Sequence, residues 1–188
     1  MSTENRVSTP PDPEETFNDL LTYAELLTTP QLARLYIYTL QHGPVTIDTI
    51  KDELEMAHST TYKYIGQLEE MKIVSRDEDE TPTTVIATPL TLEIDGAHGE
   101  FRATPAVIDA IGRQLENDDI RVFVDRQGVA KLAAAVHYTR RIIEGELSQR
   151  TAANKLEVHP VEGMTVFAAL QDVLEDATAY DPSLDLAE

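Results

Sequence analysis

The spacing of the apolar residues changes at Ile73, and this change limits the folds that the chain can adopt. Before that point apolar residues recur three or four positions apart, which is the spacing of amphipathic helices. After it they alternate over residues 73–76 and 83–87, as in two strands joined by a turn. The sequence therefore predicts several helices followed by a β-hairpin. The predicted helix starts, each marked by a proline or a hydroxyl side chain, are Pro13, Pro30, Thr46 and Ser59.

The remainder of the chain predicts a second hairpin and further helices. Residues 90–94 and 100–103 alternate on either side of a glycine-containing turn. Residues 121–124 predict a short strand or a tight connection, after a helix that ends at Asp118 and Asp119. Helical spacing predicts helices over residues 104–115, 128–147, 148–156 and 161–174. We expect an α+β protein with three parts: a disordered arm over residues 1–12, a domain over residues 13–89, and a mostly helical C-terminal domain over residues 90–188.

The segment His58–Val74, HSTTYKYIGQLEEMKIV, predicts a helix with two different faces. Thr61, Ile65 and Leu68 share the side that can close a core. The opposite side carries hydroxyl, amide, lysine and glycine residues between two tyrosines. Hydroxyl and amide groups can contact base edges, and lysine and tyrosine can contact phosphates, so this face is typical of a helix that lies in a DNA groove. Its residues are Ser59, Thr60, Lys63, Gly66 and Gln67, with Tyr62 and Tyr64 on the flanks.

The part STTYKYIGQLEEMKIV resembles the recognition helix of bacterial and archaeal winged-helix repressors, including the arsenic-repressor and multiple-antibiotic-resistance-repressor families. The resemblance covers about residues 29–89 and rests on a hydroxyl start, a base in the second turn and Leu-Glu-Glu before the first wing strand. It implies that residues 13–89 form a winged helix-turn-helix domain in a sequence-specific transcriptional regulator, which acts as a homodimer on double-stranded DNA. The wing tip, Asp77–Glu80, is acidic where those families often carry Arg or Lys. The expected DNA contacts are Ser59, Thr60, Tyr62, Lys63, Tyr64, Gln67 and Arg76.

The acidic composition bears directly on DNA binding. With 15 Lys and Arg against 34 Asp and Glu the formal charge is −19, and the acids are spread along the chain, which resembles the proteins of salt-accumulating halophilic archaea. At molar salt the Debye length is about 3 Å, so long-range repulsion from DNA is screened and close contacts survive. The alternative is a winged-helix protein–protein interaction module, for recruitment or as a DNA mimic, that does not read DNA. Residues 46–80 hold four bases and ten acids, and their tyrosines also suit protein docking.

Residues 126–155 reverse the charge of the rest of the chain, with six bases against two acids. One interpretation is a set of secondary phosphate contacts from Lys131, Arg141, Arg150 and Lys155. The other is a dimer interface on the helix over residues 128–147, because two apolar strips on it exceed what one small core would cover. In that interpretation Arg140 lies on one strip and pairs with a carboxylate. We expect the dimer interface, and hence a C-terminal domain for dimerisation or regulation.

No feature of the sequence indicates an enzyme. Cysteine is absent and the five histidines form no pair at metal-binding spacing, so no metal or cofactor is expected. The start of the chain is polar and acidic, unlike a signal peptide, and no apolar run approaches the roughly 20 residues that span a bilayer. We therefore expect a cytoplasmic protein without membrane contact. An effector pocket between the two halves is conceivable, but the sequence assigns no residue to it.

Overall fold

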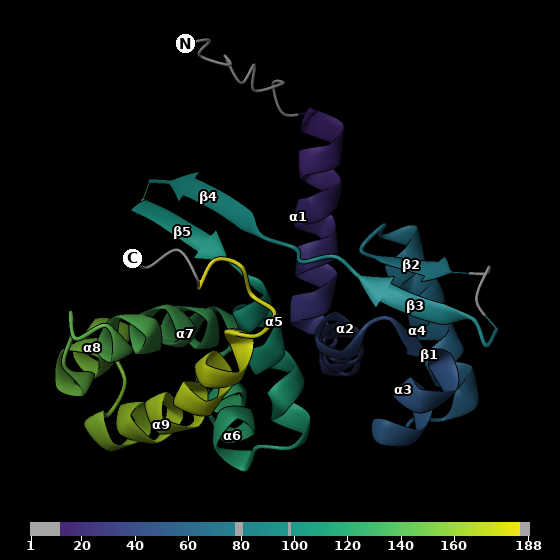
Figure 1. The fold of residues 1–188 in the computed structure, drawn as a ribbon. Helices are drawn as coiled ribbons and strands as arrows, with labels where there is room; N and C mark the ends of the chain where they lie inside the picture. Colours follow the sequence, from purple (N-terminus) through teal and green to yellow (C-terminus); the bar gives the residue numbers. More distant parts are fainter. Residues whose placement is uncertain (1–11, 78–80, 98, 185–188) are drawn as a thin grey trace, which may run out of the picture.

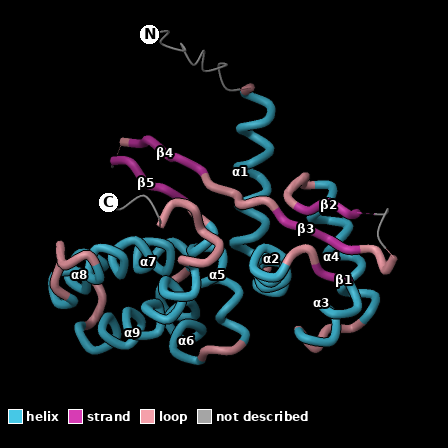
Figure 2. Tube along the Cα trace, viewed as in Figure 1, coloured by secondary structure: helices cyan, strands magenta, loops and turns pink. Residues whose placement is uncertain are grey.

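The computed structural model describes residues 12–77, 81–97 and 99–184, and within them the protein is α+β and mostly helical (Figure 1, Figure 2). The strands β1, β3 and β2 form a small antiparallel sheet in that order, with Val45 opposite Val85 and Val74 opposite Ala87. The predicted hairpin is therefore present, and β1 is added to it. The elements of this N-terminal half are α1 (Pro13–Thr28), α2 (Pro30–His42), β1 (Val45–Thr46), α3 (Ile47–Glu53), α4 (His58–Glu70), β2 (Val74–Asp77) and β3 (Thr84–Ala87).

Local signals in the sequence account for where these helices begin. The Asp12 carboxylate accepts a hydrogen bond from the Glu14 N–H at 2.9 Å, and Pro13 takes the first helical position. The Thr46 hydroxyl accepts a bond from the backbone N–H three residues later, at 3.1 Å. These predicted starts are confirmed. Of the predicted disordered arm, residues 1–11 lie outside the described residues, and Asp12 belongs to the helix cap.

The C-terminal half consists of a second hairpin and a group of helices. The two strands of the hairpin pair antiparallel, with Ile94 opposite Phe101, as predicted. Figure 1 shows this hairpin above α7, and α5 between α2 and the helices α7 and α9. The elements are β4 (Leu92–Gly96), β5 (Gly99–Ala103), α5 (Pro105–Gly112), a 3-10 turn η1 (Arg113–Leu115), α6 (Asp118–Gln127), α7 (Val129–Ile143), α8 (Gln149–Leu156) and α9 (Pro160–Ala177).

The prediction of a strand or tight connection at residues 121–124 is wrong, because these residues lie within α6. Asp118 and Asp119 begin this helix and do not end the one before it. The Asn117 side chain caps it, accepting hydrogen bonds from the N–H groups of Asp119 and Ile120 at 3.0 and 3.1 Å. The two acids then occupy the first turn, where the helix dipole stabilises negative charge.

Helix α5 joins the two halves of the molecule. All of its residues are buried, and it packs against α1, α2, α7 and α9. Its approach to α2 is close, because a Cβ atom at Gly112 would lie 3.0 Å from the backbone of Arg34. On α2 the Tyr36 hydroxyl donates to the Thr88 carbonyl at 2.7 Å and accepts from the Leu90 N–H at 2.9 Å. The two predicted domains therefore share one continuous core.

Most apolar side chains of α7 pack against the chain's own core. Leu132, Ala135 and Val136 are buried, and Tyr138 is partly buried against the same core. The chain itself therefore covers most of these strips, although Ile143 is 52% exposed, and the expected dimer interface on this helix stays a prediction. Arg140 pairs within its own helix, with 2.8 Å between its Nε and the Glu144 Oε1 atom.

An exposed apolar face lies on α1. Its N-terminal part projects from the body of the molecule (Figure 1), and Phe17, Leu20 and Leu21 are 63, 45 and 57% exposed. Only the second half of the helix packs onto the core, through residues such as Tyr23 and Leu26. The helical spacing predicted from the sequence is confirmed, but these apolar side chains face solvent.

Candidate nucleic-acid interface

Helix α4 turns one side to the core and the other to solvent, as its sequence predicts. Thr61, Ile65 and Leu68 are fully buried, and the turn into β2 follows at Ile73. The helix begins at His58, one residue before the predicted start. On the outer side Ser59, Tyr62 and Lys63 are exposed, and Thr60, Tyr64, Gly66 and Gln67 are partly buried.

The first two turns of this outer side form an ordered surface of aromatic rings around one positive charge. The Tyr62 ring stacks on the His58 ring, with 4.4 Å between the centroids. The Tyr64 hydroxyl donates to the Gln31 Oε1 atom on α2 at 3.2 Å, and this bond fixes the ring. The Lys63 Nζ atom lies 5.8 Å from the centre of the Tyr64 ring, within the range of a cation–π contact.

One of the predicted DNA contacts is paired with another side chain, and a second lies in a groove. Arg76 on β2 pairs with Glu69 of α4, with 2.8 Å between its Nε and the carboxylate. Gln67 lines a groove between α1 and α4, together with Leu21 and Glu25. To reach DNA, Arg76 would have to leave this ion pair. Gln67 would have to leave the groove, in which its Oε1 atom is buried without a hydrogen-bond partner among the described residues. The face open to a ligand therefore narrows to the first two turns of α4.

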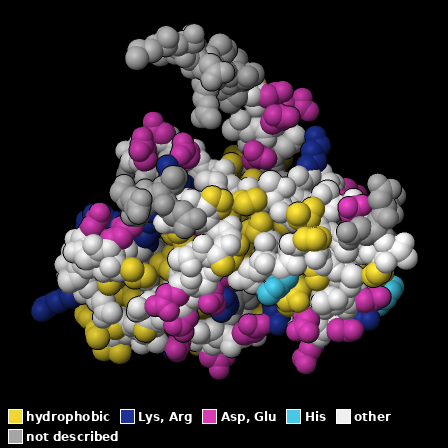
Figure 3. Space-filling view, viewed as in Figure 1, with side chains coloured by type: hydrophobic (Ala, Val, Ile, Leu, Met, Phe, Trp, Pro, Cys, Tyr) yellow, Lys and Arg dark blue, Asp and Glu magenta, His cyan; other side chains and the backbone are white. Residues whose placement is uncertain are grey.

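Lys63 is the available cation of this face. None of the ion pairs found among the described residues involves it. On the neighbouring helix α3, by contrast, Lys51 lies 3.4 Å from Asp48 and 3.2 Å from Asp52. Figure 3 shows acidic side chains over many parts of the visible face and basic ones in fewer places. Lys63 belongs to a segment, residues 46–80, in which four bases stand against ten acids.

The four bases predicted as secondary phosphate contacts lie in the other half of the molecule. Figure 1 places α8 at the end opposite α4. The Lys131 Nζ atom donates to the side chain one turn earlier at 3.2 Å, and Arg141 pairs with Glu146 at 2.8 Å. Arg150 and Lys155 are exposed on α8. These bases do not extend the outer face of α4 into one continuous surface.

Within residues 12–77, 81–97 and 99–184, no group of three or more His, Cys, Asp or Glu side chains could hold a metal ion. None of the helices in this part of the chain is both long and apolar enough to cross a membrane. One of the five histidines, His98, lies outside the described residues.

The comparisons with known proteins concern the C-terminal helices of this α+β chain. Residues 114–179 match the model of a family of unknown function, DUF7437. The matched segment spans α6 to α9, and leaves out α4, the three-stranded sheet and the second hairpin. No curated protein and no solved structure matches the chain. These comparisons therefore assign no activity to the outer face of α4.

Proposed function

We propose that this chain is a winged helix-turn-helix regulator of transcription that reads double-stranded DNA with α4 and acts as a homodimer. The observation that carries the proposal is the order of elements around α4. Helices α2, α3 and α4 are followed by the hairpin β2–β3, and β1 completes its sheet in the order β1-β3-β2. A three-helix unit with a wing is the arrangement in which the last helix enters the major groove.

The outer face of α4 has the chemistry for this role. Ser59 and Thr60 lie in its first turn, where recognition helices contact base edges. Lys63 follows one turn later and can reach a phosphate or the acceptor atoms of guanine. Tyr62 beside it can donate to a phosphate. The acidic surroundings oppose this contact in dilute buffer, whereas at molar salt only groups within a few ångströms interact. The proposal is therefore for a protein that works at high salt.

Replacing Lys63 by glutamate is expected to abolish sequence-specific DNA binding and to leave the melting temperature nearly unchanged, since Lys63 is exposed and has no ion pair among the described residues. The target sequence is first selected from random DNA at molar KCl, and affinities are then measured at that salt. Arg126→Glu on α6 is the matched control, because Arg126 is an exposed base in the other half of the molecule and is not among the expected DNA contacts.

Equal losses in the two variants would mean that net charge decides binding, and α4 would lose its role. If selection enriches no sequence at all, the chain is better described as a winged-helix module that docks other proteins. The surplus of acids around α4 favours that second function.

The exposed face of α1 is the surface we propose for the second protomer. Phe17, Leu20, Leu21 and Ala24 are spaced as a single stripe along the helix. When two copies of α1 pair antiparallel about a two-fold axis, the large Phe17 of each copy meets the small Ala24 of the other. The leucines of the two copies then meet at the centre. The stripe is therefore complementary to itself in size, as a two-fold interface requires.

Leu20→Glu is expected to convert the dimer to monomers, because it places a charge at the centre of this stripe. Mass in solution, measured by light scattering at micromolar protein and molar KCl, gives the result. Ile143→Glu is the matched control, since Ile143 is 52% exposed but lies at the end of α7. A monomeric parent protein, or dissociation by the control variant alone, would contradict the assignment to α1.

A further inference from the structure

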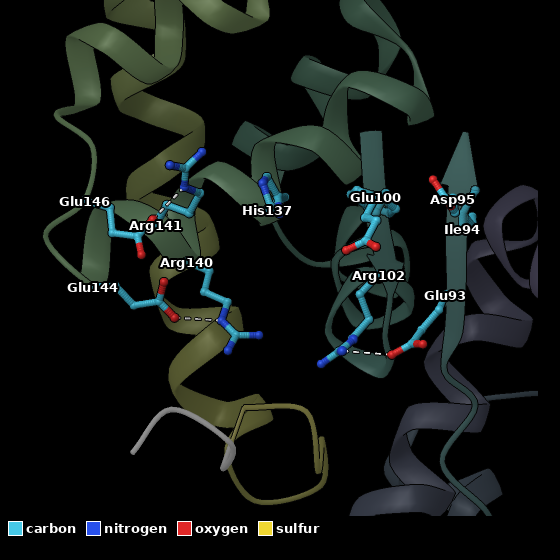
Figure 4. Close-up of a pocket in the computed structure, with 11 residues that line it drawn as sticks. Glu93, Ile94, Asp95, Glu100, Arg102, His137, Arg140, Arg141, Glu144 and Glu146 are labelled. Atoms are coloured by element: carbon cyan, nitrogen blue, oxygen red, sulfur yellow. Dashed lines mark hydrogen bonds and ion pairs between the residues drawn. The ribbon is translucent and has the colours of Figure 1, made fainter. Parts of the chain in front are cut away.

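A cavity of about 530 Å³ lies between the hairpin β4–β5 and the C-terminal end of α7 (Figure 4). It is separate from the outer face of α4. Three arginines line it: Arg102 from β5, and Arg140 and Arg141 from α7. The same lining holds five carboxylates, three of which pair with these arginines, so the guanidinium groups do not give the cavity a net positive charge.

Carboxylates at the margin hold these guanidinium groups in place. The Arg140 Nε atom donates to Glu144 at 2.8 Å, and an Arg102 Nη2 atom donates to Glu93 at 2.8 Å. A guanidinium has five N–H donors, so each group keeps further donors after these bonds. Figure 4 shows the ends of Arg102 and Arg140 directed toward one another across the cavity. An acceptor between them would receive charge-assisted bonds from both walls.

His137 adds a neutral donor to the same wall. Burial is the main cause that lowers the pKa of its imidazole, and the charges of Arg141 and then Arg140 lower it further, against the weaker opposing effect of Glu144 and Glu146. The ring is therefore uncharged near neutral pH, and one of its nitrogens carries a proton that it can donate. The Phe101 ring lies beside it, with 5.9 Å between the ring centroids.

Two further carboxylates restrict the charge of the occupant. Asp95 and Glu100 also line the cavity, and neither has an ion pair among the described residues. Figure 4 shows them on the hairpin beyond Arg102, away from the gap between the facing arginines. They repel a polyanion that fills the cavity more strongly than a single carboxylate placed between Arg102 and Arg140. The charges therefore favour a monoanion.

The cavity continues into an apolar extension. A smaller cavity of about 50 Å³ shares Phe101, Arg102, His137 and Arg140 with the first one. Its remaining wall includes Val107 of α5, Val136 of α7 and Leu174 of α9. The facing arginines thus lie next to apolar side chains that belong to three different helices. This arrangement suits a ligand with one charged end and one compact apolar end.

We propose that this cavity binds a small organic monocarboxylate with a compact apolar group. The carboxylate lies between Arg102 and Arg140, and the apolar group lies against Phe101 and points toward Val136. This site goes beyond the proposed function and does not rest on it, because neither α4 nor DNA takes part. The three helices that line the extension include two from the segment shared with the family of unknown function.

The test uses the full chain at molar KCl and three probes, benzoate, benzamide and inorganic phosphate, with binding followed by isothermal titration calorimetry and ligand-observed NMR. Benzoate is expected to bind. Benzamide has the same shape without the charge and is expected to bind at least 10-fold more weakly, the loss typical of a charge-assisted hydrogen bond. Phosphate is expected to bind more weakly than benzoate, because it lacks the apolar group and carries more charge.

Two variants locate the site. Arg140→Gln should weaken benzoate binding about 10-fold or more. The control Arg121→Gln, which removes an exposed arginine paired to Asp118 on α6, should leave the affinity unchanged. Absence of benzoate binding, equal binding of benzoate and benzamide, or phosphate binding as tight as benzoate would each overturn the proposal. The comparison of probes on the parent protein decides the matter even if Arg140→Gln fails to fold.

Discussion

Truncating Phe123 to alanine is expected to lower the free energy of unfolding by about 3–5 kcal/mol, the usual cost of removing a buried aromatic side chain. Phe123 is 2% exposed and lies on α6, which packs against α7 and α9. In a chain of this length each kcal/mol shifts the melting temperature by about 2–4 °C, so a decrease of roughly 10 °C should appear in a thermal melt. Chemical unfolding at fixed salt gives the free energy itself.

Val122→Ala is the matched control for this prediction. Val122 is the adjacent residue on the same helix and is only partly buried, so its truncation should cost well under half as much. Equal losses at the two positions would mean that α6 does not direct Phe123 into the core. A loss under about 1 kcal/mol for Phe123→Ala would have the same meaning.

Replacing Asp109 by alanine should cost about 3 kcal/mol, because it removes the centre of a buried polar network. Asp109 is 4% exposed. Arg113 donates to both of its oxygens, at 3.1 and 3.3 Å, and the Tyr180 hydroxyl donates to one of them at 2.6 Å. Alanine leaves these donors without their acceptor. Arg113 would still keep its ion pair with Asp176, in which its Nη2 atom lies 2.6 Å from the carboxylate. Unfolding by denaturant measures the loss.

Asp109→Asn separates the hydrogen bonds of this network from its charge. Burial raises the pKa of the Asp109 carboxyl above its ordinary 3.8, although the bonds from Arg113 and Tyr180 act in the opposite direction. Relative to the unfolded chain, the fold therefore stabilises the neutral carboxyl, and asparagine, which keeps an acceptor oxygen, should be tolerated better than alanine.

The sign of the pH dependence follows from the raised pKa. Protonation of Asp109 stabilises the fold fully below the ordinary pKa of 3.8, and this contribution is lost as the pH rises through the folded value. On acidification from pH 7, the parent protein should therefore gain stability relative to Asp109→Asn. The measurement is the difference between the two proteins at each pH, since the remaining carboxyl groups titrate in both. A difference that stays constant, or that changes in the other direction, would contradict the raised pKa.

The sequence predicts most of the elements because their signals are local. Asp12 with Pro13, and Thr46, mark helix starts within one turn of the residues that they cap. The hairpins are likewise predicted by alternation within each strand and a turn between the strands. The two-residue strand β1 is missed, since it is defined by its pairing with β3, far along the chain.

The prediction of a strand or tight connection at residues 121–124 is wrong because the local signals in α6 conflict. Val122, Phe123 and Val124 favour a strand by propensity, and Asp118 and Asp119 suit a helix end as well as a helix start. The Asn117 cap and the burial of one side of the segment decide in favour of a helix. Burial of that side depends on α7 and α9, which follow later in the sequence.

At the candidate interface too, some features follow from the local sequence and others depend on tertiary contacts. Which side of α4 faces the core follows from its own sequence, and Thr61, Ile65 and Leu68 are buried as predicted. The ion pair of Arg76 with Glu69, and the position of Gln67 in the groove next to α1, depend on tertiary contacts that helical spacing does not contain. The cavity between β5 and α7 was beyond prediction for this reason too. Its facing arginines are 38 positions apart in the sequence.

The complete burial of α5 determines how the protein can be divided for study. This helix lies outside residues 114–179, yet it forms a wall for α2 on one side and for α7 and α9 on the other. A fragment cut after residue 89 would expose the α5 side of α2, and a fragment that begins at residue 114 would expose the inner sides of α7 and α9. Either fragment would present apolar surface to solvent and tend to aggregate. The helices that match the family model are thus a recognisable stretch of sequence, and in this chain their inner sides depend on α5, which lies outside the match.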